Sequence, residues 1–279
     1  MTARAIEVVD LTMTYGDVRA VDGVSLAVDE GEFVGILGPN GAGKTTTLEI
    51  IEGLRKPDSG SVTLLGEPVW PRNPRLLPRI GVQLQASSFF ERLTAREQIH
   101  TFAALYAVPT ATADAWLERV GLTDKAGARV EELSGGQAQR LSIACALVHD
   151  PDVVFLDEPT AALDPQARRN LWDLLSGLND SGRTVVLTTH YMDEAEALCD
   201  RVAIMDQGRV LRFDSPAALV RGLDAPTRIT LADGEVLSTR DPAAEVARLA
   251  SEHRLDGLQV QTGTLEDVFL DLTGREYRA

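Results

Sequence analysis

The feature that most constrains how this chain can fold is a glycine-rich loop between two short periodic segments. Residues 38–45 read GPNGAGKT and fit the pattern G-x-x-x-x-G-K-[ST] at every fixed position. The run EFVGIL before the loop is typical of a strand, and TTTLEIIEGL after it carries apolar residues at helical spacing as far as Gly53. A strand, such a loop and a helix in this order predict a phosphate-binding turn in an α/β fold.

The residues of this loop have separate expected roles. Backbone N–H groups and the helix N-terminus would bind a polyphosphate. Lys44 would place a compact charge on the β- and γ-phosphates, and Thr45 would offer its hydroxyl to Mg²⁺. Only three of the 27 basic residues are Lys, so a lysine here indicates that a point charge is needed. The expected phosphate site comprises Gly38, Pro39, Asn40, Gly41, Ala42, Gly43, Lys44, Thr45 and Thr46.

Further apolar runs predict the sheets. VVFLDE and TVVLTTH are separated by a helical stretch from Pro165 to Leu178, which is the βαβ pattern of a buried parallel sheet. The alternating segments IEVVDL, VSLAV and EFVGIL instead predict antiparallel strands. RVAIMDQGRVLRF predicts a hairpin that turns at Gln207-Gly208. The expected fold is α/β, a P-loop NTPase with a parallel core sheet and an antiparallel β-subdomain.

The remaining segments predict helices and a second domain. Residues 94–120 read as a helix capped by Thr94 and broken at Pro109, and a further helix opens at Ser134. We expect them to form a helical subdomain at about 86–150. We expect a large domain over 1–222 and a small α+β domain over 223–279, in the order ββαβα, whose last helix is capped by Thr264 and ended by Gly274.

Two acidic residues follow the apolar run at 153–156. Asp157 would emerge at the carboxyl end of a parallel strand beside the phosphate loop, where a carboxylate can hold Mg²⁺. The adjacent Glu158 could orient an attacking water or accept its proton. Many strands end in acidic turns, but downstream of a phosphate loop this pair indicates hydrolysis rather than binding alone.

A second anion-binding pattern lies at the start of the Ser134 helix. In isolation LSGGQ is a capped helix with a flexible entry, but two glycines and a hydroxyl at a helix N-terminus can also bind phosphate. If this loop lies far from the first site, a symmetric head-to-tail dimer would bring it onto the partner's nucleotide. The residues concerned are Ser134, Gly135, Gly136 and Gln137.

GPNGAGKTT, LSGGQ, VVFLDE and TTH in this order closely resemble the ATP-binding subunit of ABC transporters, over about residues 4–222. The resemblance implies that Tyr15 stacks on adenine and that Asp164 communicates between two sites. It also implies that His190 contacts the γ-phosphate and that Gln85 contacts Mg²⁺ or water. Gln83 offers a competing register for that glutamine, and Ala161 stands where the family more often has Ser.

The resemblance also implies partners. A homodimer would hold ATP and Mg²⁺ at its interface and drive a separate integral-membrane permease from the inner face of the cell membrane. Residues 86–128 would form the groove for the permease, with Phe89, Phe90 and Leu93 as candidate lining. The tail at 265–274 resembles bacterial drug and antibiotic export ATPases of the daunorubicin-exporter type, which implies export of a drug-like or hydrophobic compound.

Two other functions fit parts of the pattern. One is a soluble ABC ATPase without a transport role, as in translation factors or DNA-repair enzymes, but the tandem ATPase halves, long insertions and basic faces usual there do not appear in the sequence. The other is a regulatory nucleotide-binding module without turnover, against which Glu158 and His190 both argue.

Composition narrows the classes further. The formal net charge is −15 and the pI is about 4.7, without a compensating basic run, which argues against a nucleic-acid partner. No apolar stretch reaches the roughly 20 residues that a bilayer requires, and the N-terminus has no apolar signal core, so we expect a cytoplasmic chain. Cys145 and Cys199 are expected to be buried free thiols.

Overall fold

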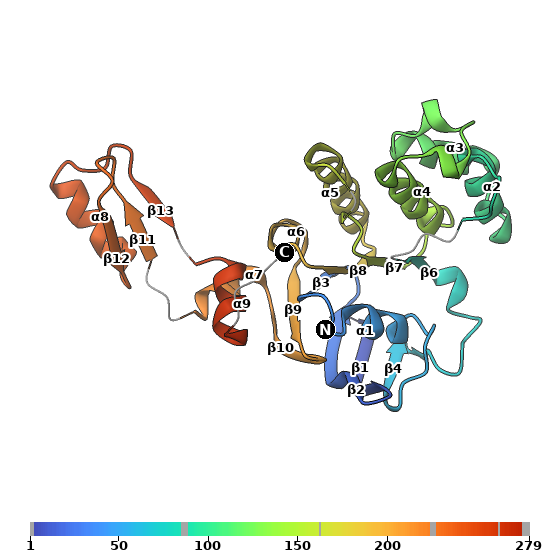
Figure 1. The fold of residues 1–279 in the computed structure, drawn as a ribbon, viewed down its shortest axis with the longest axis horizontal. Coiled ribbons are helices and arrows are strands. Elements are labelled where there is room, and N and C mark those ends of the chain that lie inside the picture. The colour runs from blue at the N-terminus through green and yellow to red at the C-terminus, as the bar shows by residue number, and fades with distance from the viewer. Residues whose placement is uncertain (1–2, 85–88, 162, 224–226, 262, 275–279) are drawn as a thin grey trace. The chain divides into compact units, whose positions relative to one another are not determined.

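The computed structural model describes residues 3–84, 89–161, 163–223, 227–261 and 263–274 (Figure 1). The chain forms two compact units, Met1–Phe213 and Asp214–Ala279, which are described separately. The division precedes helix α7 (Pro216–Arg221), because α7 packs against helix α9 (Leu265–Thr273). The unit boundary therefore falls before the predicted one at 222/223.

A six-stranded sheet in the order β10-β9-β3-β8-β7-β6 forms the centre of the first unit. Its pairs β9–β3, β3–β8, β8–β7 and β7–β6 are all parallel, which confirms the predicted parallel core sheet. The carboxyl ends of these five parallel strands therefore meet at one edge. The six strands of the sheet are β3 (Phe33–Leu37), β6 (Ile80–Gln83), β7 (Val153–Asp157), β8 (Thr184–Thr189), β9 (Arg201–Asp206) and β10 (Arg209–Asp214).

A second, antiparallel sheet has the order β2-β1-β4-β5. Its strands are β1 (Arg4–Tyr15), β2 (Val18–Asp29), β4 (Ser59–Leu64) and β5 (Glu67–Pro68). The prediction that EFVGIL joins this sheet is wrong, because β3 pairs in parallel on both sides in the central sheet. All five β3 residues are buried, as in a strand that is covered on both faces.

Helix α1 (Lys44–Ile51) lies between the two sheets and contacts strands of both. Its buried Leu48, Ile50 and Ile51 join one hydrophobic core with Ile6 of β1 and Ile36 of β3. The core holds the loop at the start of α1 in a fixed relation to both sheets. On the other face of the central sheet, an added Cβ at Gly35 would lie 2.7 Å from the Cys199 sulfur, at the end of α6 (Met192–Leu198).

The helical subdomain contains α2 (Ala95–Leu105), α3 (Thr110–Arg119) and α4 (Gly135–Leu147), which pack together (Figure 1). The break at Pro109 is as predicted, since this residue is the N-cap of α3. Thr94 and Ser134 cap α2 and α4 through capping boxes, which confirms both predicted caps. Short 3₁₀ turns lie at Leu77–Arg79, Thr123–Lys125 and Val130–Glu132.

The second unit has the predicted ββαβα order after α7. It contains β11 (Thr227–Thr230), β12 (Val236–Thr239), α8 (Pro242–Ser251), β13 (Gln259–Gln261) and α9. Its sheet has the order β12-β11-β13, and Ile229, Leu231 and Leu249 form a separate small core. Thr264 caps α9, and Gly274 ends it in a left-handed conformation.

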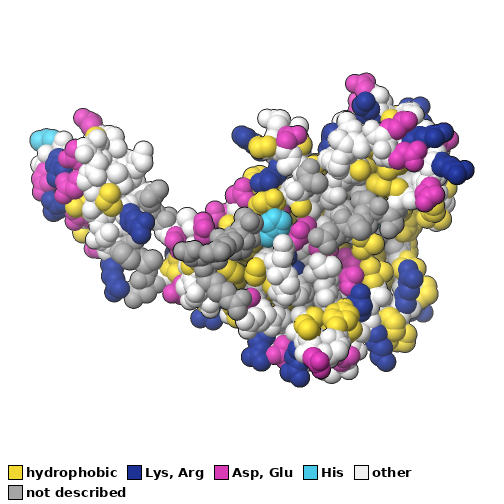
Figure 2. Space-filling model, in the orientation of Figure 1, with side chains coloured by type: hydrophobic (Ala, Val, Ile, Leu, Met, Phe, Trp, Pro, Cys, Tyr) yellow, Lys and Arg dark blue, Asp and Glu magenta, His cyan; other side chains and the backbone are white. Residues whose placement is uncertain are grey.

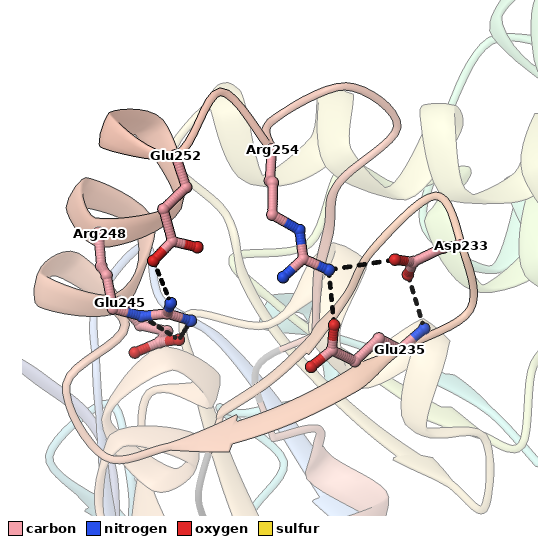
Figure 3. A network of polar contacts seen from close by, with 6 residues as sticks. All are labelled: Asp233, Glu235, Glu245, Arg248, Glu252 and Arg254. Atoms are coloured by element: carbon pink, nitrogen blue, oxygen red, sulfur yellow. Dashed lines mark hydrogen bonds and ion pairs between the residues drawn. The ribbon is translucent and has the colours of Figure 1, made fainter.

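Two arginines organise the polar surface of this unit (Figure 3). Arg248 contacts Glu245 and Glu252 along α8, and Arg254, which follows α8, contacts Asp233 and Glu235 between β11 and β12. On the face seen in Figure 2, Lys and Arg side chains are interspersed with Asp and Glu. Among helices in the described ranges, none has the length and hydropathy to span a bilayer.

Candidate nucleotide-binding site

The glycine-rich loop joins β3 to α1, and two of its glycines have no room for a side chain. Gly43 is the N-cap of α1 with φ 96°, and a Cβ there would lie 2.2 Å from the Ala20 carbonyl oxygen. A Cβ at Gly38 would lie 2.3 Å from the Met205 carbonyl oxygen. The loop is therefore packed directly on neighbouring backbone, and its conformation is open to glycine alone at these positions.

Lys44 is buried at the start of α1, with 4 % of its surface exposed. Its Nζ donates to the carbonyl oxygens of Gly38 at 2.8 Å and Pro39 at 3.2 Å. The same Nζ lies 3.3 Å from Glu158 Oε1. The ammonium is thus held inside the loop by two carbonyls and one carboxylate, in a position from which it can reach an entering phosphate.

Asp157 is the last residue of β7 and is 3 % exposed. Its Oδ1 accepts hydrogen bonds from Thr188 Oγ1 and from Thr45 Oγ1, the latter at 3.3 Å. Burial raises the pKa of Asp157, against the lowering effect of both hydroxyls. A buried carboxylate beside a threonine hydroxyl is a hard oxygen pair that suits Mg²⁺, whose other ligands would be phosphate oxygens and waters.

Glu158 and His190 meet beside Lys44. Glu158 has φ 47°, uncommon for a non-glycine residue, and its backbone N–H donates to Thr188 Oγ1 at 3.0 Å. His190 follows β8, and its Nδ1 lies 3.4 Å from Glu158 Oε1. Their side chains are 9 % and 19 % exposed. The sheet edge thus places a carboxylate, an imidazole and an ammonium within contact distance.

A cavity of about 660 Å³ opens over the loop, a volume within the range of small-molecule sites. Tyr15 stands at its rim, 41 % exposed, with the Arg55 guanidinium carbon 5.2 Å from its ring centroid. An exposed ring face here can stack on a nucleobase. The lining residues are Tyr15, Val18, Arg19, Ala20, Asn40, Gly41, Gly43, Lys44, Thr45, Thr46, Glu158 and Gln207.

Four of these lining residues were not anticipated. Val18, Arg19 and Ala20 come from the start of β2, and Gln207 comes from the β9–β10 turn. The Asp22 N–H donates to Gly208 O at 2.8 Å and brings the two segments together. No local pattern marks these residues, because their position depends on contact between segments almost 190 residues apart in the chain.

The Ser134 loop lies elsewhere on the unit. Ser134 Oγ accepts from the Gln137 N–H at 3.3 Å, Gln137 Oε1 accepts from the Ser134 N–H at 3.0 Å, and Ser134 and Gly135 are exposed. Among the described residues that line the cavity, none comes from this loop. Asp164 also lies outside that set; it caps α5 (Pro165–Asp180) by accepting from Gln166 N and Ala167 N.

The predicted switch glutamine, Gln85, lies outside the described residues. Gln83 ends β6 with its side chain fully buried, and its Nε2 donates to Leu84 O at 2.6 Å. Of the candidate groove residues, Phe89 and Leu93 are half-buried and Phe90 is 52 % exposed. Phe90 is therefore the most exposed of the three.

The cysteines behave as predicted. Cys145 and Cys199 are both free and buried. Burial raises the pKa of Cys145 to about 12, so the thiol stays protonated near neutral pH. Neither residue contributes to the site.

Comparison with known proteins agrees with this geometry. Residues 21–161 match the family model described as ABC transporter. The chain is 41 % identical to the Nod factor export ATP-binding protein I of Burkholderia orbicola (strain AU 1054), over 99 % of both chains. It is 40 % identical to the protein of that name from Ralstonia nicotianae, over 98 % of this chain and 95 % of the relative.

Solved structures give the same result. A dimeric post-hydrolysis state of the ATP-binding cassette MJ0796, bound to ADP and Pi, matches with TM-score 0.69 and 31 % identity over 75 % of this chain and 98 % of that one. An ATP-binding subunit of an ABC transporter matches with TM-score 0.71 and 28 % identity over 78 % and 92 % of the respective chains. The chain therefore belongs to the ABC transporter family, as an ATP-binding subunit with ATPase activity.

Proposed function

We propose that this chain hydrolyses MgATP at the edge of its central sheet with a defined division of labour. Lys44 and the loop N–H groups bind the β- and γ-phosphates, and Tyr15 stacks on the base. Glu158 orients or deprotonates the attacking water, and His190 contacts the γ-phosphate. Thr45, Asp157 and Gln85 hold Mg²⁺, which neutralises phosphate charge when bound.

The observation that carries this proposal is the meeting of Lys44, Glu158 and His190. Glu158 Oε1 lies 3.3 Å from the Lys44 ammonium and 3.4 Å from His190 Nδ1. An entering γ-phosphate offers Lys44 a more highly charged partner than Glu158. The lysine then moves from the carboxylate to the phosphate and leaves the carboxylate free to receive a proton from water.

We also propose that hydrolysis needs a second copy of the chain. The residues Ser134–Gln137 form an exposed helix N-terminus that can bind phosphate, yet none of them is among the described lining of this copy's cavity. A head-to-tail dimer would place that helix on the partner's nucleotide, and Asp164 would lie near the contact between the two sites. Dimeric structures among the solved relatives support the formation of a dimer.

The closed dimer would drive a separate integral-membrane permease from the inner face of the cell membrane. Phe90 and its neighbours on the helical subdomain would receive the permease, because an exposed phenylalanine beside half-buried apolar residues fits an apolar partner segment. Outward transport is supported by the names of the relatives, which are export ATP-binding proteins. The cargo class we propose is a drug-like, antibiotic or hydrophobic compound.

Purification from membranes tests the transport role against the soluble alternative. The tagged chain, expressed in its own cells and extracted with detergent, should co-purify with an integral-membrane protein in a fixed ratio. Phe90→Asp should abolish this co-purification, whereas Val236→Asp, an equally exposed apolar position in the second unit, should not. A chain recovered entirely from the soluble fraction, with no membrane protein attached, would favour a non-transport ABC ATPase.

A further inference from the structure

His190 is the first of three side chains that contact one another in series, followed by Tyr191 and Arg168. The His190 and Tyr191 rings lie 4.1 Å apart between centroids, with 42° between their planes. The Arg168 guanidinium carbon lies 4.1 Å from the Tyr191 ring centroid. Arg168 belongs to α5, whereas His190 follows β8, so the Tyr191 ring bridges a helix and the hydrolytic edge of the sheet.

The Tyr191 ring supports the Arg168 guanidinium, which also interacts electrostatically with the buried Glu194 carboxyl group. The Arg168 side chain is 20 % exposed, and its Nε is buried without a hydrogen-bond partner among the described residues. Asp193 approaches the guanidinium only to 3.7 Å and is itself 62 % exposed, so this ion pair contributes little. A partly desolvated cation over an aromatic face is more strongly attracted than an exposed one. The ring and the guanidinium therefore fix each other's orientation.

Arg168 also connects this contact to Asp164, at the start of α5. The Arg168 N–H donates to the Asp164 carbonyl oxygen at 2.9 Å, so the two residues lie one helical turn apart at the start of α5. One turn further along, Trp172 Nε1 donates to Glu194 Oε1 at 3.1 Å, and Glu194 is fully buried on α6. Two successive turns of α5 thus contact the segment that follows His190, through Arg168 and Trp172.

We propose that Arg168 and Tyr191 are positioning residues, which hold the His190 imidazole close to Glu158. Through this contact, a movement of the N-terminal end of α5, at Asp164, would also move the imidazole. The inference rests on the proposed roles of His190 and Glu158. Tyr191 limits the rotation of the imidazole whose Nδ1 lies 3.4 Å from Glu158 Oε1. A displacement of about 1 Å in such a group can lower a rate by up to about 100-fold. A shift of α5 caused by the second copy would in this way reach the site of hydrolysis.

A double-mutant cycle on steady-state ATPase kinetics of the full chain tests this coupling. Tyr191→Ala and Arg168→Met should each lower kcat about tenfold and leave KM for ATP within about twofold. The kcat of the double variant should be no lower than that of the more impaired single variant, because both changes disrupt the same contact. Tyr191→Phe, which keeps the ring face, should retain kcat within about twofold. So should Arg169→Met, a change at the exposed neighbouring arginine.

The opposite outcomes are equally distinct. Wild-type kcat in Tyr191→Ala, or a double variant whose loss is the product of the two single losses, would overturn the inference. Thermal unfolding accompanies each assay, and Tyr191→Leu replaces Tyr191→Ala if the latter is unfolded. His190→Gln separates a failure of the proposed function from a failure of the positioning role. Wild-type turnover in that variant would defeat the proposed function itself. Loss of turnover in His190→Gln with full activity in Tyr191→Ala would defeat only the positioning role.

Discussion

Glu158 is held in an unusual backbone conformation by its neighbours. Its φ of 47° is accompanied by hydrogen bonds from its N–H to both the hydroxyl and the carbonyl oxygen of Thr188. Strained residues of this kind persist where the surroundings determine them, and they gather at functional sites. The strain turns the carboxylate away from the strand and toward Lys44 and His190.

Glu158→Gln should separate binding from turnover. The amide cannot accept the water's proton, so ATPase turnover should fall about 100-fold or more. The Lys44 ammonium loses its carboxylate partner and becomes more available to phosphate, so nucleotide affinity should be retained or increase. Gel filtration with ATP should show an accumulated dimer. Glu235→Gln, in the second unit, provides the control, and normal steady-state turnover in Glu158→Gln would refute its role as the base.

Single residues of the site can be predicted from the sequence where they belong to a motif of consecutive residues. Lys44, Asp157 and Glu158 follow from local motifs, because each motif carries its own strand or helix and so its own geometry. Val18 and Gln207 could not be found in this way, since they reach the cavity through the contact of two distant turns. The ion pair between Lys44 and Glu158 was also not anticipated, because it forms between the ends of two different strand-loop units.

Helix α1 has the phosphate loop at its N-terminus and a buried carboxyl group, that of Glu52, at its C-terminus. Glu52 is the C-cap residue, and its two carboxyl oxygens find no hydrogen-bond partner among the described residues. Burial, followed by the charges of Asp157 and Glu49, raises the pKa of Glu52 well above its ordinary value of 4.5. The folded state therefore binds the Glu52 proton more tightly than the unfolded state does.

This shift predicts a pH-dependent stability. The contribution of Glu52 to the free energy of unfolding is fully present below pH 4.5 and is lost as the pH rises through the raised pKa. Glu52→Gln cannot ionise, so its stability relative to the wild type should increase over that window by about 1.4 kcal/mol per unit of pKa shift. Urea unfolding at a series of pH values measures the difference. The exposed Glu266→Gln should show no such trend, and a pH-independent difference for Glu52→Gln would contradict the prediction.

Two helices of the subdomain begin with the same cap but should differ in function. Thr94 on α2 and Ser134 on α4 each accept a hydrogen bond from the backbone N–H three residues later. Thr94→Ala and Ser134→Ala should each cost about 1 kcal/mol of stability. Only Ser134→Ala should also lower ATPase turnover, by about tenfold, since its hydroxyl would contact the partner's nucleotide. Equal activity in the two variants would argue against that contact.

Strand β3 shows where pattern alone falls short for an element. The segments before it alternate as antiparallel strands do, and the prediction extends the alternating pattern to EFVGIL. Four of its five residues are apolar and the fifth is Gly35, which gives the continuous run of a strand buried on both faces. The caps at Thr94, Ser134 and Thr264 were predictable because a cap depends on only a few consecutive residues.

At the scale of the whole chain, each unit has its own core. In the first unit, Val210 and Phe213 of β10 pack against the main core, and the Arg201 guanidinium carbon lies 4.2 Å from the Phe213 ring centroid. In the second, Ile229, Leu231 and Leu249 form a small separate core, against which Leu237, Val246 and Leu258 pack. Separate cores are the physical condition for independent folding of two domains.

A chain that ends at Asp214 should therefore fold and bind nucleotide. It keeps β10 and the main core, so its affinity for ATP should lie within about twofold of the full chain's, as measured by fluorescence titration. A chain that ends at Asp206 loses Val210 and Phe213 and should be unfolded by circular dichroism. Loss of nucleotide binding in the longer truncation would show that the second unit supports the first. The pattern of strands and helices predicted the order of elements in the second unit, but the boundary itself depends on the contact of α7 with α9.

The close packing beneath the phosphate loop limits which parts of the site can be altered. At Gly38 and Gly43 any side chain meets the backbone of other strands, so these two positions of the loop cannot be substituted. The rim is different: Tyr15 and Val18 are 41 % and 66 % exposed and accept new side chains without disturbing the core. A search for variants that use another purine or pyrimidine triphosphate should therefore randomise the rim. Such a library keeps the phosphate chemistry intact in every member.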